Sequence, residues 1–292
     1  MFAFSTDSTP YERVVRAARP GIIHRKFVRE SEVLPGVGFT ADLVKYQGGN
    51  GTFSAPRHRH DFDQIRFIVS GRADFGHGLL GKAGHVIFFP AGTHYGPEEI
   101  EDSEVMLIQW SKSWVWRADS DAAHSEMSKV GEFKDGWYVT RGDDGIERRA
   151  DARNAVFEFA TGKKLVYPTP RYPQPILMMP EGFAWRPHTE GVDVKMLGRF
   201  TEDDVYVGNY RWSGTGRLAL TPERTQLLWV VAGPVRVGGE EHQARSVIFS
   251  DFDESVDVEA SEGAEVVVFG LPLPAPAQVD LPTDVEPSAA RA

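Results

Sequence analysis

The sequence predicts an all-β protein made of two similar halves joined by a partly helical linker, and three observations predict it. Short apolar runs broken by glycine, proline and aspartate fill most of the 292 residues, which is typical of a β-sandwich or barrel. These runs stop over residues 113–174, where helical spacing replaces them, and they resume at Pro175. Segments of the second β-rich region also repeat segments of the first.

These changes of pattern divide the chain into five parts. Residues 1–20 are expected to form an arm or short helix, and residues 21–112 form a first barrel. The linker follows over residues 113–174, and a second barrel occupies residues 175–272. The last part, residues 273–292, is rich in proline and alanine with little to bury, which predicts a disordered tail.

Composition narrows the class of protein. The chain is 41% hydrophobic and 25% charged, as soluble globular proteins are. Its net charge of −10, with no long basic run, argues against a nucleic acid or a membrane surface as partner. The absence of cysteine excludes disulfides, thiolate metal sites and cysteine nucleophiles. Because the N-terminus lacks a signal-peptide core and no apolar run approaches about 20 residues, we expect a cytoplasmic protein.

Three histidines form the most informative pattern in the chain. His58 and His60 are two residues apart in a strand-like stretch, so both side chains lie on one face. His94 follows a strand of valine, isoleucine and phenylalanine that ends in a Pro-Ala-Gly turn. If the two strands pack in one barrel, three imidazoles meet inside it. Such a donor set suits iron, zinc, copper or nickel better than calcium or magnesium.

This arrangement resembles the cupin family. The family's first motif is a glycine, an HxH pair, a glutamate and a glycine, to which we align Gly51, His58, His60, Gln64 and Gly71. Its second motif is a glycine, five residues, PxG, two residues and a histidine, to which we align Gly84, Pro90, Gly92 and His94. The resemblance covers residues 51–97 and departs from the family at Gln64. It implies two jelly-roll barrels, a bicupin, with one divalent metal in the N-terminal barrel.

The internal repeat indicates that the second barrel has lost this site. Residues 227–233 align with residues 65–71, and residues 246–255 align with residues 85–94. Extended over the motifs, the alignment places three residues without imidazoles at the positions of His58, His60 and His94, namely Leu220, Pro222 and Ser255. We therefore expect no metal in the second barrel, and a role in stabilising the first barrel or forming a subunit interface.

Gln64 and Arg66 stand beside the expected metal. Gln64 has a counterpart, Gln226, in the half that lacks the HxH pair, which favours a structural or substrate-facing role. Direct ligation by Gln64 is the second interpretation, because a neutral amide is a weak ligand beside imidazole. Arg66 shares the inward face with Gln64, while Ile65, Phe67 and Val69 share the other. It either clamps a substrate carboxylate or pairs at the rim with Asp61 or Asp63.

Four further residues are candidates for contact with a substrate. Tyr95 could act as an acid or base, but neighbours on a strand point in opposite directions, which favours a core or rim position. Met106, Ile108 and Trp110 lie on one face of their strand, where they either line the pocket or fill the core.

With iron, the family resemblance implies oxygen activation on a substrate that chelates Fe(II). A local similarity to three-histidine, gentisate-type ring-cleaving dioxygenases favours C–C cleavage in a small anionic aromatic or enolisable compound. The alternative is redox-neutral isomerase, hydrolase, lyase or cyclase chemistry on zinc, nickel or manganese. A bicupin that only binds a small ligand is the third hypothesis. The expected partners are the small anionic molecule and, with iron, O2, and exposed sheet edges allow a homodimer.

Overall fold

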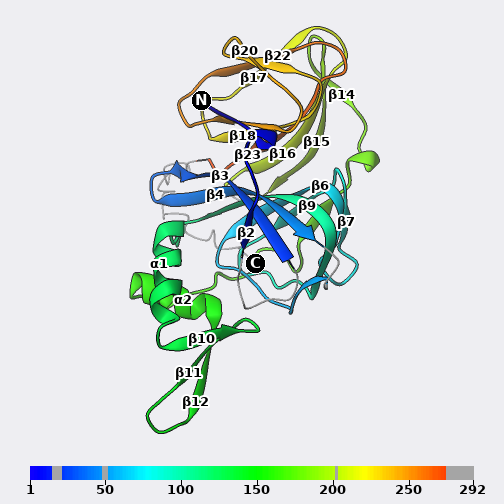
Figure 1. Cartoon of the computed structure of the whole chain (residues 1–292). Coiled ribbons are helices and arrows are strands. Elements are labelled where there is room, and N and C mark those ends of the chain that lie inside the picture. The colour runs from blue at the N-terminus through cyan, green and yellow to red at the C-terminus, as the bar shows by residue number, and fades with distance from the viewer. Residues whose placement is uncertain (15–21, 48–51, 201–202, 274–292) are drawn as a thin grey trace, which may run out of the picture.

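Two β-barrels are stacked on one another in the computed structural model, and the linker lies beside the first of them (Figure 1). The structure describes residues 1–14, 22–47, 52–200 and 203–273. The predicted all-β class is confirmed, because strands far outnumber helices in the described chain. All of the predicted tail beyond residue 273 lies outside the described residues.

The first half is organised around one sheet, in which neighbouring strands are antiparallel in the order β13-β8-β6-β9-β4-β3-β2. Two short strands, β5 and β7, pair with β9 and β6. The strands are β2 (Glu12–Val14), β3 (Ile22–Leu34), β4 (Val37–Gln47), β5 (Phe53–Ala55), β6 (Asp63–Asp74), β7 (Leu80–Lys82), β8 (Val86–Phe89), β9 (Glu98–Ser111) and β13 (Ile176–Met178).

The second half has two sheets. The larger has the order β1-β21-β18-β23-β16-β15-β14, and the smaller has the order β17-β22-β19-β20. The strands are β1 (Phe2–Ser5), β14 (Arg186–Thr189), β15 (Val192–Phe200), β16 (Val205–Trp212), β17 (Gly216–Leu220), β18 (Gln226–Ala232), β19 (Val235–Val237), β20 (Glu240–His242), β21 (Ser246–Ser250), β22 (Val256–Ala260) and β23 (Glu265–Gly270).

The two halves exchange strands, which differs from the boundaries expected from the sequence. The N-terminal segment is not a free arm or helix, because β1 adds to β21 of the second half and β2 adds to β3 of the first. Conversely, β13 lies after the linker but pairs with β8 of the first barrel. A short 3-10 helix, η1 (Thr6–Ser8), connects β1 to β2 across the seam between the halves.

The linker forms a small layer of its own. Helices α1 (Arg117–Met127) and α2 (Ala152–Thr161) pack against one another through Met127 and Val156. A three-stranded sheet of β10 (Gly131–Lys134), β11 (Trp137–Arg141) and β12 (Glu147–Asp151) projects from them (Figure 1). A second 3-10 turn, η2 (Pro180–Gly182), follows β13. In the described part of the chain, neither helix is long and apolar enough to span a bilayer.

Side chains of β6 alternate between two environments, as predicted. Ile65 and Phe67 are buried between the halves, where the ring of Phe67 lies 6.1 Å from that of Trp229. Gln64 and Arg66 take the opposite face, toward the interior of the first barrel. The first barrel therefore has an apolar back, covered by the second half, and an interior that accommodates polar groups.

Met106, Ile108 and Trp110 fill the core and do not line the barrel interior. All three belong to the buried cluster between the halves, and Ile108 lies opposite Ile65 in the sheet. The alternative in which they contact a substrate is therefore wrong. Their strand, β9, presents this face to the second half because its register with β6 matches apolar residues on both strands.

Candidate active site

Backbone pairing shows which residues of the two halves are equivalent. In the first half, His58 pairs with Tyr95 in an isolated antiparallel bridge, and Gln64 lies opposite Phe89. In the second half, Leu220 pairs with Val256, and Gln226 lies opposite Ser250. A single hydrogen bond also recurs, from Gly92 N to His60 O in the first half and from Asp253 N to Pro222 O in the second, each 2.8 Å long.

The HxH pair lies at the surface of the first barrel beside the buried Tyr95, and this part of the surface is called the mouth. The rings of His58 and His60 have centroids 5.0 Å apart and are both partly exposed. His58 is held in place through its Nδ1, which lies 2.7 Å from the carbonyl oxygen of Pro56. His60 stacks on Phe62 at 4.4 Å between ring centroids. Both imidazoles are therefore positioned and remain reachable from solvent.

His94 does not join the pair. Its side chain is exposed, while its neighbour Tyr95 is 2% exposed and faces the interior. Partial burial and the guanidinium groups of Arg57 and Arg59 lower the pKa of His94, which places it among the basic residues on the outside of the bridge. Among the described residues, no group of three His, Cys, Asp or Glu side chains is arranged to hold a metal. The expected meeting of three imidazoles is not formed.

Tyr95 occupies the position expected for the third histidine. Only Thr93 separates His94 from Gly92, whereas the two-residue spacing of the cupin motif leads to position 95. Because side chains alternate along an extended segment, this difference of one residue decides which group enters the barrel. The ring of Tyr95 lies 4.5 Å from that of His58, measured between centroids. The sequence contained this signal, in the spacing of its own motif.

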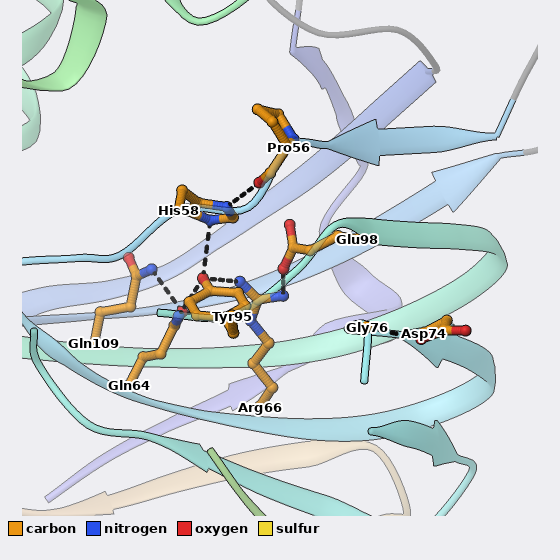
Figure 2. Close-up of polar contacts among 9 residues, drawn as sticks. All are labelled: Pro56, His58, Gln64, Arg66, Asp74, Gly76, Tyr95, Glu98 and Gln109. Atoms are coloured by element: carbon orange, nitrogen blue, oxygen red, sulfur yellow. Dashed lines mark hydrogen bonds and ion pairs between the residues drawn. The ribbon is translucent and has the colours of Figure 1, made fainter. Parts of the chain in front are cut away.

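Three side chains converge on the phenol oxygen of Tyr95 (Figure 2). Gln64 Nε2 and Arg66 Nη2 each donate to Tyr95 Oη at 2.9 Å. His58 Nε2 lies 3.1 Å from the same oxygen. The Pro56 carbonyl can only accept, so His58 carries its proton on Nδ1 and its Nε2 accepts. Tyr95 therefore accepts from Gln64 and Arg66 and donates to His58.

Arg66 is a buried cation with a buried partner. Its Nη1 donates to Glu98 Oε1 at 2.5 Å, and the two side chains are 7% and 1% exposed. Burial acts to lower the pKa of Arg66, but the Glu98 carboxylate and the Tyr95 hydroxyl outweigh it and raise the pKa, so the guanidinium stays charged. Its plane also lies over Phe89, with the central carbon 4.6 Å from the ring centroid. Sequence reasoning missed Glu98.

The acidic residues expected to pair with Arg66 have other partners. Asp61 accepts from Arg153 of α2, and Asp63 accepts from Arg171 of the segment that follows α2. The expected rim pairing of Arg66 is therefore wrong. Both ion pairs tie the linker to the segment between β5 and β6 that carries the HxH pair, or to the first residue of β6.

Gln64 holds the network together through both ends of its amide. While Nε2 donates to Tyr95, Oε1 accepts from Gln109 Nε2 at 3.2 Å and from Arg66 Nε at 3.4 Å. Its counterpart Gln226 is also buried, and it accepts from Tyr206 and donates to a backbone carbonyl. The second barrel thus keeps a glutamine at this position in a purely structural role.

The second barrel shows that the fold does not require the polar network. At the positions of His58, Arg66, Tyr95 and Gln109 it has Leu220, Leu228, Val256 and Gly270. The first three of these are part of an apolar core. A buried ion pair and its hydrogen bonds add little stability over apolar residues of similar size. The network of the first barrel is therefore better explained by function, as clusters of buried ionisable groups often are.

Sequence comparisons identify no relative. No protein-family model matches the chain, and no curated protein matches it either. Solved structures do share its architecture. A Nostoc punctiforme protein, named provisionally as a dioxygenase, matches 95% of this chain and 84% of its own at 12% identity, with a TM-score of 0.60.

Two further structures extend the comparison. The E. coli protein Ylba matches 92% of this chain and 90% of its own at 9% identity, with a TM-score of 0.52. Oxalate decarboxylase from Bacillus subtilis, which is described with Mn(II) centres, matches 92% of this chain and 76% of its own at 14% identity, with a TM-score of 0.50. The chain therefore has the cupin fold, in its two-barrel form.

The residues of the first barrel fit poorly to the three-histidine metal site of the cupin resemblance. Two imidazoles are present, but the third position holds a phenol whose oxygen already accepts from Gln64 and Arg66. The Arg66 guanidinium would also stand 2.9 Å from that ligand atom, where its positive charge opposes a second cation. What the geometry does provide is a polarised hydroxyl beside an imidazole.

Proposed function

We propose that the first barrel is the active site of a redox-neutral enzyme, in which Tyr95 and His58 move a proton to or from a small anionic substrate. The observation that carries this proposal is the set of contacts at Tyr95 Oη. Two donors approach it, and an imidazole acceptor stands 3.1 Å away. General acid–base catalysis needs a positioned group whose charged form is stabilised, and this oxygen meets that requirement.

The proton has a defined route between these groups. Tyr95 gives its hydroxyl proton to His58 Nε2, and the imidazolium that forms keeps its Nδ1 proton on the Pro56 carbonyl. The phenolate that remains is stabilised by the N–H groups of Gln64 and Arg66. It can then accept a proton from a substrate held at the mouth. The reverse sequence makes Tyr95 the acid.

An anionic substrate is favoured by the charges around the mouth. Arg57 and Arg59 alternate with His58 and His60 along their segment, and their charges are close enough to His94 to lower its pKa. The chain as a whole has a net charge of −10, so these positive side chains contrast with the acidic balance of the whole protein. Such a patch raises the local concentration of anions near the opening.

A proton-exchange screen tests this function across a set of candidate substrates. Small carboxylates with acidic C–H bonds, such as 2-oxo and 2-hydroxy acids, are incubated in D2O with the protein and followed by proton NMR. At least one compound is expected to lose a C–H signal faster with the wild-type protein than with His58→Gln. Equal exchange with both proteins, across compounds that do exchange, contradicts the proposal.

A metal-dependent enzyme is the second candidate, and the intact HxH pair favours it. Fe(II) in this barrel would support a dioxygenase acting on a small anionic aromatic or enolisable compound, whereas zinc, nickel or manganese would support hydrolytic or isomerising chemistry. His58 and His60 would hold the ion, since their rings are 5.0 Å apart and both are reachable. The names given to the Nostoc and Bacillus proteins agree with this candidate.

Metal content distinguishes the two candidates. If the acid–base proposal is right, protein purified without chelators contains much less than one metal ion per chain, because two imidazoles alone hold a metal weakly. If the metal candidate is right, mass spectrometry finds about one ion per chain, which His60→Ala removes. His94→Ala is the matched control and is expected to leave the metal content unchanged, since His94 lies outside the barrel.

A further inference from the structure

A second polar cleft lies at the seam between the two halves, away from the Tyr95 network. Its volume is about 480 Å³. It is lined by the N-terminal segment, by β3, β4, β6 and β9 of the first half, and by Arg245 from the loop before β21 of the second half. Neither the proposed catalysis nor the cupin resemblance uses any of these residues.

Two carboxylates that line the cleft, those of Glu104 and Asp7, are bound to Arg245. Its Nη1 and Nη2 donate to the two oxygens of Glu104 at 2.9 and 2.8 Å, and its Nε donates to Asp7 at 3.0 Å. Tyr11 also donates to Glu104. Burial acts to raise the pKa of Glu104, but the hydrogen bonds from Arg245 and Tyr11 lower it overall, so it remains a carboxylate.

Lys26 stands beside this cluster without an ion pair of its own. It is 6% exposed, and no carboxylate oxygen of a described residue lies within 4.0 Å of its ammonium. Its Nζ donates to the carbonyl oxygen of Thr6 at 2.5 Å and lies 4.3 Å above the ring of Tyr11. Burial and the nearby Arg245 lower the pKa of Lys26 and outweigh Glu104 and Asp7, which act in the opposite direction.

We propose that Lys26 is a carbonyl-reactive amine that forms a Schiff base with a small 2-oxo acid held in this cleft. The lone pair of Nζ attacks the carbonyl carbon, and the carbonyl oxygen takes up a proton to give a carbinolamine. Loss of one water molecule then forms the C=N bond, with no net oxidation or reduction. Lysines beside a second cation and removed from water act in this way.

Lys45 supplies a positive charge that complements the carboxylate of a 2-oxo acid. It lies on β4, diagonally across from Lys26 on the same face of the sheet, and its exposed side chain also lines the cleft. This diagonal position on one face brings the two side chains near each other, and the charge of Lys45 adds to the lowering of the pKa of Lys26. A substrate carboxylate next to the reacting carbonyl would therefore meet Lys45.

Reductive trapping tests the proposal in the full-length wild-type protein. The protein is incubated with pyruvate and sodium cyanoborohydride at pH 7, digested, and mapped by mass spectrometry. Lys26 is expected to form the reduced adduct about tenfold faster than Lys45, because its lowered pKa leaves more of its amine uncharged at pH 7. Modification of Lys26 at the same rate as the exposed lysines, or not at all, overturns the proposal.

One variant and one second probe distinguish recognition of the substrate carboxylate from simple access to the Lys26 amine. Lys45→Met should slow trapping of pyruvate at Lys26 more than trapping of propionaldehyde, which has no carboxylate, because the loss of the Lys45 charge raises the pKa of Lys26 for both probes. Equal slowing of both probes would contradict the role of Lys45. Because the main comparison is made among lysines of one wild-type protein, it does not depend on the folding of a Lys26 variant. The result also does not bear on the function proposed for the Tyr95 site, because the two sites share no residue.

Discussion

Replacing Glu98 by glutamine is expected to lower the free energy of unfolding by about 3–5 kcal/mol. The substitution keeps the size of the side chain and removes its charge, so the guanidinium of Arg66 loses its buried counter-ion. Because Arg66 is 5% exposed and packs between aromatic rings, water cannot take the place of the carboxylate. Urea unfolding followed by tryptophan fluorescence measures the change.

An ion pair in the second half supplies a matched control for this loss of stability. Asp257 accepts from Arg217 at 2.9 Å, but both side chains are about half exposed. Asp257→Asn is therefore expected to cost at most about 1 kcal/mol. In the Glu98→Gln background, Arg66→Leu should restore much of the stability, since Leu228 stands at the equivalent position. Similar costs for Glu98→Gln and Asp257→Asn would show that the Arg66 pair is not isolated from solvent.

Tyr95→Phe is expected to reduce turnover by about 10²- to 10⁴-fold on any substrate that the exchange screen identifies. The ring keeps its packing, and only the oxygen that exchanges a proton with His58 is lost. Stability should fall by about 1–3 kcal/mol, because the donors on Gln64 and Arg66 lose their shared acceptor. Steady-state kinetics and urea unfolding of the same preparation measure the two effects.

Tyr206→Phe separates the catalytic effect from the structural one. Tyr206 donates to Gln226 at 2.6 Å in the second barrel, where Leu220 stands in place of His58. This variant should lose stability to a similar degree and keep full turnover. A Tyr95→Phe protein that retains its turnover would remove Tyr95 from the mechanism. An equal loss of turnover in both variants would point to a general loss of structure.

The sequence predicted the architecture well because its signals are local. Alternation along single strands predicted that Gln64 and Arg66 face inward and that Ile65 and Phe67 face away, as the structure shows. The internal repeat is confirmed residue by residue, since the bridge between His58 and Tyr95 recurs between Leu220 and Val256. Strand period and repeated segments can be read without the tertiary fold.

The site was predicted less well, for two separate reasons. The motif alignment predicts His94 as the third residue of the cluster, but a shift of one residue along an extended segment reverses the side chain, and Tyr95 enters the barrel. Glu98 gave no signal, because it lies in an acidic run that reads as a solvated surface. Its burial depends on Arg66, 32 residues earlier, and only the closed barrel brings the two together.

The strand exchange was also beyond sequence reasoning. Phe2 pairs with Phe249, and Ile176 pairs with Phe88, so each partner lies in the other half of the chain. Short edge strands such as these have weak local signals. Their place is decided by which sheet edge is open once both barrels exist.

Because of this strand exchange, neither barrel is encoded by a continuous part of the gene that could be separated from the other. A gene fragment that ended before the linker would encode a first barrel without β13 and with β1 left over, and the complementary fragment would lack β1. Neither product could complete its own sheet. Deleting the barrel that lacks the HxH pair, from the end of the linker onward, would therefore leave the first barrel without β13, which lies in the same stretch of chain.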